Sequence, residues 1–230
     1  MCLYCEFVSS YSAAADRTAF YQEHAGRIDE SRQISYLDLY FVGDVSCGKT
    51  SLVKAMKMKA CPYPVQSSEF REHVHYKYHL FHEEPCLVIS RLIDDRRMED
   101  VKTRRIWYTG LCSFTAVIVL CYSIDSCESF NNVKKWLTEI REHCGRNIKD
   151  IRIILLGLKT DLRFEEKAGE FVFHKEGKKM AKKIGASCYI ECSTVSGEGI
   201  DEVFKKAYEM ISEVRSKGRL CRMLKFCMPF

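Results

Sequence analysis

The sequence predicts a single α/β domain built on a doubly wound, mostly parallel β-sheet with one antiparallel edge strand. Two nearly continuous apolar runs, residues 116–122 and 151–158, are typical of parallel strands that helices cover on both faces. Amphipathic stretches lie between and after these runs, which is the alternation expected of a doubly wound sheet. A chain of 230 residues is long enough for one such domain with a sizeable core.

The expected elements follow one another along the chain. A strand over residues 36–42 ends at Gly43, and a glycine-containing loop leads into a helix over 49–59. A hairpin follows, in which the first strand alternates over residues 72–81 and places His75 and His79 on an exposed polar face. The remaining expected elements are the second hairpin strand over 86–93, helices over 128–143, 175–184 and 200–214, and a short strand over 188–191.

Composition separates the two ends of the chain from the domain, which we expect over residues 34–214. Residues 1–33 are polar and lack periodicity, so they are expected to form a disordered extension. Residues 215–230 contain five basic and no acidic side chains, which accounts for the net charge of +5. Such a tail indicates contact with an anionic surface, either a membrane or a nucleic acid. A DNA-binding fold would spread its charge more widely, so no nucleic-acid partner is expected.

Hydropathy and cysteine content indicate the compartment. No apolar run approaches the roughly 18 residues of a membrane span, and the N-terminus lacks the pattern of a signal sequence. The thirteen cysteines are odd in number and scattered through expected strands and helices. Reduced thiols in a soluble, cytoplasmic protein are therefore expected.

The strongest motif is a G-x-x-x-x-G-K-[ST] loop between a strand and a helix. Its glycines let backbone N–H groups converge on phosphate oxygens, while Lys49 neutralises phosphate charge and the Thr50 hydroxyl ligates Mg²⁺. Cys47 lies inside the loop, where N–H dipoles could lower the pKa of its thiol, or it simply fills space. The predicted phosphate contacts are Gly43, Asp44, Val45, Ser46, Cys47, Gly48, Lys49, Thr50 and Ser51.

A phosphate loop can belong to an ATPase, a nucleotide kinase or a GTPase, so a base-reading motif has to decide between them. Leu158-Lys159-Thr160-Asp161 directly follows an expected apolar strand. A carboxylate at Asp161 can accept the N1 and N2 hydrogens of guanine, which adenine cannot supply. We therefore predict that Lys159, Asp161 and Leu162 contact guanine and that the ligands are GTP or GDP with Mg²⁺.

With these motifs the chain resembles the Rho-family small GTPases of the Ras superfamily, and among them the atypical, GTPase-impaired Rnd-like group. The resemblance spans about residues 36–211 and includes Tyr-Ile-Glu-Cys-Ser at 189–193. It implies a P-loop NTPase fold in which Ser193, Thr194 and Val195 support the guanine and Tyr63 packs over it. It also implies effector proteins that bind the switch segments 62–73 and 94–110, exchange factors, and signalling to actin and cell shape.

Several positions depart from the family pattern at the hydrolytic centre. Val45 replaces the glycine of most relatives, where its branched side chain would block the water-positioning glutamine and an arginine finger. In the second switch Asp94 remains for Mg²⁺, but Arg97 and Met98 replace the glycine and the glutamine, so no catalytic residue is intact. Ser68 is the expected Mg²⁺ ligand of the first switch. These departures predict very slow GTP hydrolysis.

Two further departures concern the base-reading loop. Leu158 stands where the family has Asn or Thr, which removes a hydrogen bond across the nucleotide site and should weaken affinity. Residues 164–174 are too few for the helical insert typical of Rho proteins. A pseudo-GTPase scaffold that acts by docking alone remains the alternative to a switch. A kinase is disfavoured because Asp161 and Ser193 specify guanine support.

The tail carries a possible membrane anchor. Cys227-Met-Pro-Phe230 matches a C-a-a-X pattern whose final Phe suggests geranylgeranylation, although Pro229 departs from the usual aliphatic residue. The basic residues of the tail and palmitoylation at Cys221 would supply the second signal that stable anchoring needs. We expect a peripheral protein on the cytoplasmic face of the plasma membrane or of endomembranes, with an unmodified basic tail as the alternative.

Overall fold

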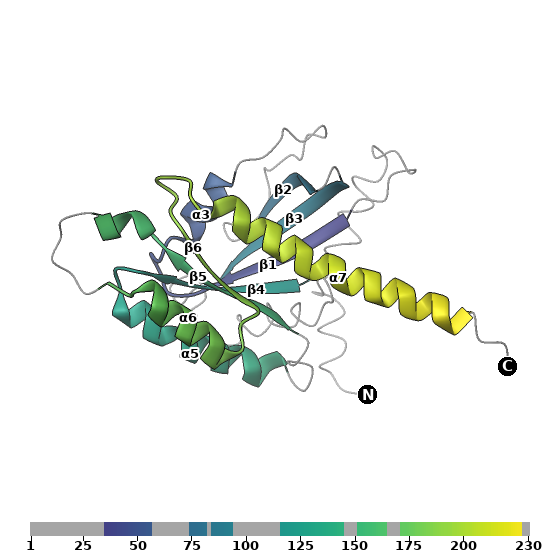
Figure 1. Cartoon of the computed structure of the whole chain (residues 1–230). Helices are drawn as coiled ribbons and strands as arrows, with labels where there is room; N and C mark the ends of the chain where they lie inside the picture. Colours follow the sequence, from purple (N-terminus) through teal and green to yellow (C-terminus); the bar gives the residue numbers. More distant parts are fainter. Residues whose placement is uncertain are drawn as a thin grey trace, which may run out of the picture.

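The computed structural model describes residues 35–56, 74–81, 84–93, 116–144, 151–164 and 171–226. Within these ranges six strands form one sheet in the order β2-β3-β1-β4-β5-β6, with helices packed on both faces (Figure 1). The strands are β1 (Ser35–Val42), β2 (Val74–Phe81), β3 (Glu84–Ile93), β4 (Ala116–Ser123), β5 (Arg152–Leu158) and β6 (Cys188–Cys192). Strand β2 pairs antiparallel with β3, and every other pairing is parallel. The predicted fold class is confirmed.

The helices separate into two layers that enclose the central strands. Helices α3 (Lys49–Ala55) and α7 (Ile200–Phe226) cover one face, and α5 (Cys127–Cys144) and α6 (His174–Ile184) cover the other (Figure 1). Because helices cover both faces of the sheet, β4 is buried at every position, and it carries apolar side chains on both faces. A 3₁₀ turn, η4 (Thr160–Phe164), follows β5 and was not expected from the sequence.

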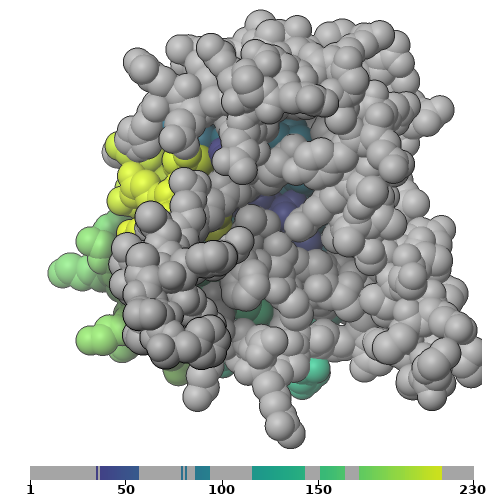
Figure 2. All heavy atoms as spheres, turned by 90° about the vertical axis from the view of Figure 1, so that its right-hand side faces the viewer, coloured from purple at the N-terminus to yellow at the C-terminus, as the bar shows by residue number. Residues whose placement is uncertain are grey.

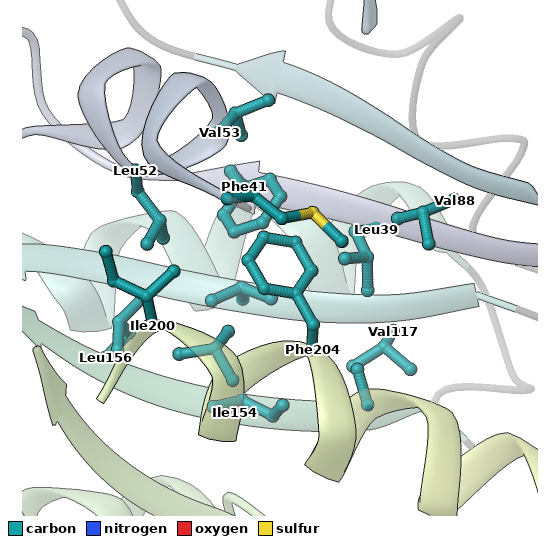
Figure 3. Packing of buried hydrophobic residues seen from close by; sticks show 14 of the residues in the cluster. Leu39, Phe41, Leu52, Val53, Val88, Val117, Ile154, Leu156, Ile200 and Phe204 are labelled. Carbon is teal, nitrogen blue, oxygen red and sulfur yellow. The ribbon is translucent and has the colours of Figure 1, made fainter. Parts of the chain in front are cut away.

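The larger core lies between the sheet and helices α3 and α7. Figure 3 shows Phe204 of α7 lying over the strands close to Phe41 of β1, and their ring centroids are 6.2 Å apart. Leu52 of α3 and Ile200 of α7 close the same cluster near the loop that follows β1. On the other face Trp136 of α5 is buried in the core cluster between the sheet and helices α5 and α6. The sheet therefore has a rigid support under the ends of its central strands.

The prediction that His79 lies on an exposed face of the first hairpin strand is wrong. The His79 ring stacks on Phe81 at 4.2 Å between centroids, and Phe81 stacks on Tyr208 of α7 at 4.4 Å. Alternation alone could not reveal this, because it does not show that α7 reaches across to the edge strand β2. The aromatic stack thus fastens the edge strand to the helix.

Two helices end at different residues from those expected. Helix α3 ends at Ala55, because Met56 leaves the helical conformation and buries its side chain in the core. Helix α7 continues to Phe226 through most of the basic segment, where Arg, Lys, Leu and Met are strong helix formers. Figure 1 shows it projecting beyond the sheet, and its described side chains form a yellow surface patch in Figure 2. No helix in the described part of the chain is long and apolar enough to span a membrane.

Candidate functional site

The phosphate loop leaves the sheet where β1 ends, in close contact with two neighbouring strands. The Gly43 amide donates to the Ile93 carbonyl at 3.3 Å. A β-carbon on Gly43 would lie 2.2 Å from the Cys121 carbonyl oxygen of β4, so a side chain does not fit there. Ser46 (φ 62°) and Gly48 (φ 112°) then adopt left-handed conformations that turn the chain sharply into α3.

Lys49 is buried within this loop, with 3% of its surface exposed. Its ammonium group donates hydrogen bonds to the Gly43 carbonyl at 2.8 Å and to the Asp44 carbonyl at 2.7 Å. A buried charge is costly unless polar partners hold it, and these carbonyls belong to the loop itself. The loop therefore holds a positive charge in a fixed place, as phosphate binding requires.

The start of α3 adds a second feature that favours anions. Gly48 precedes the helix without a side-chain cap, and the first turn of this described helix contains no acidic residue. Thr50 is partly exposed there, and Ser51 is exposed. N–H groups at the start of a helix carry partial positive charge, so this turn is suited to a phosphate.

The suggestion that the loop lowers the pKa of the Cys47 thiol is wrong, because the pKa is raised. The side chain is buried in the core cluster below the loop, and this burial raises its pKa even though Lys49 lies nearby. The thiol Sγ lies 3.8 Å from the Lys49 Nζ atom. Cys47 is therefore a space-filling residue rather than a reactive thiolate.

The base-reading residues meet at the ends of β5 and β6. The Ser193 hydroxyl, directly after β6, donates a hydrogen bond to the Asp161 carboxylate in η4. The same hydroxyl oxygen accepts from the Val195 amide at 3.1 Å and orders the loop that contains Thr194. The Leu162 amide bonds the Lys159 carbonyl at 3.1 Å, which closes the turn around Asp161. This hydrogen bond joins the two loops that are predicted to recognise guanine, although Asp161 and Ser193 are 32 positions apart in the sequence.

Leu158 connects the base-reading loop to the phosphate loop through an apolar contact. The side chain is 1% exposed and belongs to the cluster that also contains Cys47 and Leu52. A β-carbon built on Gly48 would lie 3.5 Å from Leu158 Cδ1, so the leucine lies next to the loop. Van der Waals packing therefore replaces the hydrogen bond expected from an Asn or Thr here.

Lys159 lies beside this contact. It has a left-handed backbone (φ 64°), and its ammonium group lies 3.7 Å from the Asp125 carboxylate. The ion pair connects the base-reading loop to the turn that follows β4.

Sequence reasoning missed a polar network behind the guanine loops. Arg163 binds Glu191 through two hydrogen bonds, at 2.6 and 2.7 Å, and also donates to the Val172 carbonyl at 2.6 Å. Burial raises the pKa of Glu191, but hydrogen bonds from Arg163 and Tyr189 and the positive charge of Arg163 together outweigh it and hold the pKa below its usual range. His174 Nδ1 lies 3.2 Å from the Glu191 carboxylate. A signal was available, since both residues lie within the span 36–211 of the family resemblance and Glu191 belongs to its Tyr-Ile-Glu-Cys-Ser stretch.

Two tyrosines extend this network into the core. The hydroxyl groups of Tyr122 and Tyr189 are 2.7 Å apart, and Tyr189 donates to Glu191. Burial raises the pKa of Tyr122 to about 12, so the hydroxyl stays protonated and able to donate near neutral pH. The network therefore connects β4, β6 and the start of α6 behind the site.

Several predicted residues lie outside the described part of the chain. Five of them belong to the expected switches and base contact, and one is the expected prenylation site. Cys221 lies within the described backbone of α7. The residues outside the described ranges are Tyr63, Ser68, Asp94, Arg97, Met98 and Cys227.

The described residues fit a guanine nucleotide with Mg²⁺. The fit rests on the buried Lys49 ammonium, the left-handed turns of its loop and the Ser193–Asp161 hydrogen bond. Thr50, at the start of α3, is the described residue that could ligate Mg²⁺. The loop would hold the phosphates, and Asp161 would accept from the base.

Comparison with known proteins agrees with this geometry. The profile described as "Ras family" matches residues 38–213. GTP-binding protein RHO3 of Eremothecium gossypii is 29% identical over 202 residues, which cover 78% of this chain and 85% of that protein. GTP-binding protein RHO1 of Candida albicans is 31% identical over 199 residues (81% and 94%), and Rho-related protein racI of Dictyostelium discoideum is 32% identical over 187 residues (76% and 85%). The chain belongs to the Ras family of small GTPases, with homologues among Rho-type GTP-binding proteins.

Proposed function

We propose that this chain is a Rho-type GTP-binding switch of the Rnd-like group that remains GTP-bound because it hydrolyses GTP very slowly. The observation that carries guanine-nucleotide binding in this proposal is the meeting of two loops at the carboxyl edge of the sheet. The Lys49 loop follows β1, and the Asp161–Ser193 pair follows β5 and β6. Ligands of doubly wound sheets bind at this edge.

Each side chain has a distinct task in this proposal. Lys49 neutralises the phosphates from inside the loop, and Asp161 accepts the guanine N1 and N2 hydrogens while Ser193 fixes the carboxylate. Bound Mg²⁺ would neutralise further phosphate charge, held by Thr50 with the predicted ligands Asp94 and Ser68. Because Asp161 has a fixed hydrogen-bond partner, the site is preorganised for guanine rather than adenine.

Slow hydrolysis is proposed from three substitutions. Val45 lies partly exposed in the phosphate loop, where most relatives have glycine. Arg97 and Met98 stand in place of the glycine and glutamine of the second switch. Without the glutamine, attacking water is not oriented, and a blocked arginine finger alone costs roughly 10³–10⁵ in rate.

The partners proposed for the GTP-bound form are effector proteins that bind the switch segments and control actin and cell shape. Membrane attachment is proposed through the basic tail, with lipid groups on Cys227 and Cys221. Persistent GTP binding would make synthesis, localisation and degradation of the protein the means of regulation, since hydrolysis would not end the signal.

The proposal is tested by denaturing the purified full chain and identifying the released nucleotide by chromatography. GTP is the expected result, whereas GDP would indicate a cycling GTPase and absence of nucleotide would indicate a docking scaffold. Single-turnover hydrolysis of γ-labelled GTP, with and without a Rho-type activating protein, then measures the rate. The triple variant Val45→Gly, Arg97→Gly, Met98→Gln should hydrolyse faster than wild type. A stimulated wild-type rate equal to that of ordinary small GTPases would overturn the proposal of a persistently GTP-bound state.

A further inference from the structure

The carboxylate of Asp44 in the phosphate loop is held by helix α5. The Trp136 indole N–H donates to Asp44 Oδ1 at 2.7 Å, and the Asn132 amide donates to Oδ2 at 2.7 Å. The main-chain carbonyl of the same aspartate accepts from the Lys49 ammonium, also at 2.7 Å. One loop residue therefore connects the phosphate-binding lysine to a helix about 90 residues further along the chain.

Helix α5 is firmly anchored to the sheet at the point where it reaches the loop. Trp136 is 6% exposed, and Val133, Leu137 and Ile140 bury the same side of the helix. At its start the Ser129 hydroxyl accepts from the Ser123 amide at 3.0 Å. These contacts hold the helix against the sheet, so the two donors have a defined position relative to the ends of the strands.

An acidic residue in a phosphate loop needs such an arrangement. A free carboxylate at this place would repel phosphate oxygens, and two strong donors that hold it toward α5 weaken that repulsion. They also fix the Asp44 backbone, and with it the carbonyl that orients Lys49. Neither donor is within the phosphate or base motifs, so both would act through Asp44.

We infer that Trp136 and Asn132 are positioning residues that hold the phosphate loop of this chain in its nucleotide-binding conformation. The inference rests on the proposed guanine-nucleotide binding. It predicts that the loop loosens, and nucleotide leaves faster, when either donor is removed while the packing of α5 is retained.

The test is a double-mutant cycle on the dissociation rate of a fluorescently labelled GDP from the full chain. Trp136→Phe keeps an aromatic ring but removes the N–H, and it should speed dissociation roughly tenfold. Asn132→Ala should act in the same direction. In an Asp44→Ala background Trp136→Phe should have little further effect, because its acceptor is gone. Lys135→Ala, an exposed residue of the same helix, is the matched control.

A second readout does not need nucleotide. The chain has two tryptophans, so in a Trp107→Phe background Trp136 is the sole indole. Asp44→Ala should then shift its fluorescence emission, and an unchanged spectrum would overturn the contact itself. If Trp136→Phe speeds dissociation equally with the native Asp44 and in the Asp44→Ala background, the positioning role is overturned. If wild type failed to bind guanine nucleotide, the proposed function would be overturned, and with it the role of the two donors in binding. The spectral shift, if present, would still establish the contact between Trp136 and Asp44.

Discussion

The Arg163 guanidinium binds the Glu191 carboxylate in a two-point arrangement, with Nη1 donating to Oε2 at 2.6 Å and Nη2 to Oε1 at 2.7 Å. Arg163 follows the base-reading Asp161 by two positions, and Glu191 precedes Ser193 by two positions. The ion pair therefore lies directly behind the Ser193–Asp161 hydrogen bond. It holds together the two loops that are predicted to recognise guanine.

Removal of this ion pair should destabilise the protein. Both side chains are mostly buried, with 23% of Arg163 and 14% of Glu191 exposed, so Arg163→Ala leaves a carboxylate without its main partner. We expect the free energy of unfolding to fall by about 1.5–3 kcal/mol, measured by urea denaturation. Lys206→Ala, which breaks the more exposed Lys206–Glu209 pair, serves as the control and should leave the midpoint almost unchanged. Equal effects of the two variants would contradict the structural role of Arg163.

The same ion pair predicts a pH dependence of stability. The pKa of Glu191 is lowered in the folded state, since burial, which raises it, is outweighed by the hydrogen bonds from Arg163 and Tyr189 and the charge of Arg163 together. Its contribution is therefore fully present above the unfolded value of about 4.3 and is lost as pH falls through the lowered folded pKa. The stability difference between wild type and Glu191→Gln should shrink as urea titrations move from pH 7 to pH 3. A constant difference across that range would refute the assignment.

The predicted role of Asp161 can be tested through base preference. Asp161→Asn replaces one acceptor oxygen by a donor, so the variant should lose affinity for guanine nucleotides and gain relative affinity for xanthine nucleotides. Competition binding with GDP and xanthosine diphosphate measures the ratio. Asp201→Asn, at an exposed position of α7, is the control. An unchanged ratio in the Asp161 variant would show that another group reads the base.

Leu158 offers a gain-of-function test. Leu158→Asn places an amide next to the phosphate loop, where the family pattern has Asn or Thr, and should slow GDP dissociation by roughly two- to tenfold through one added hydrogen bond. Leu158→Ala creates a cavity without that bond, so it should speed dissociation and lower stability by about 2–5 kcal/mol. Similar acceleration in both variants would mean that packing alone matters at this position.

Membrane attachment is expected to depend on Cys227. Cell fractionation should find the wild-type chain partly in membranes and Cys227→Ser mostly outside them, because basic residues alone, at about 1 kcal/mol each, bind an anionic leaflet reversibly. Cys221→Ser separates a palmitoyl contribution from the prenyl one. Equal membrane partition of wild type and Cys227→Ser would remove the lipid from the proposal and leave the basic tail.

The sequence alone was sufficient to predict the fold and the local geometry of the phosphate loop. Continuous apolar runs require burial on both faces, which made 116–122 and 151–158 central parallel strands, and β4 and β5 occupy those positions. The phosphate loop could be predicted because its spacing specifies local backbone geometry, and local geometry depends on neighbouring residues. Gly48 has the left-handed conformation that such a loop needs.

The tertiary structure decided what depends on contacts between distant segments. Periodicity does not report which helix crosses an edge strand, so the stacking of His79 and Phe81 toward Tyr208 could not be predicted. A sequence motif likewise does not show which distant side chains contact its residues. The Arg163–Glu191 ion pair and the Asp44 contacts with Trp136 and Asn132 join residues 28 to 92 positions apart. Cys47 makes the same point, because loop dipoles suggested a lowered pKa, whereas burial against the core raises it. Desolvation depends on the whole fold, and only the packed chain determines its size.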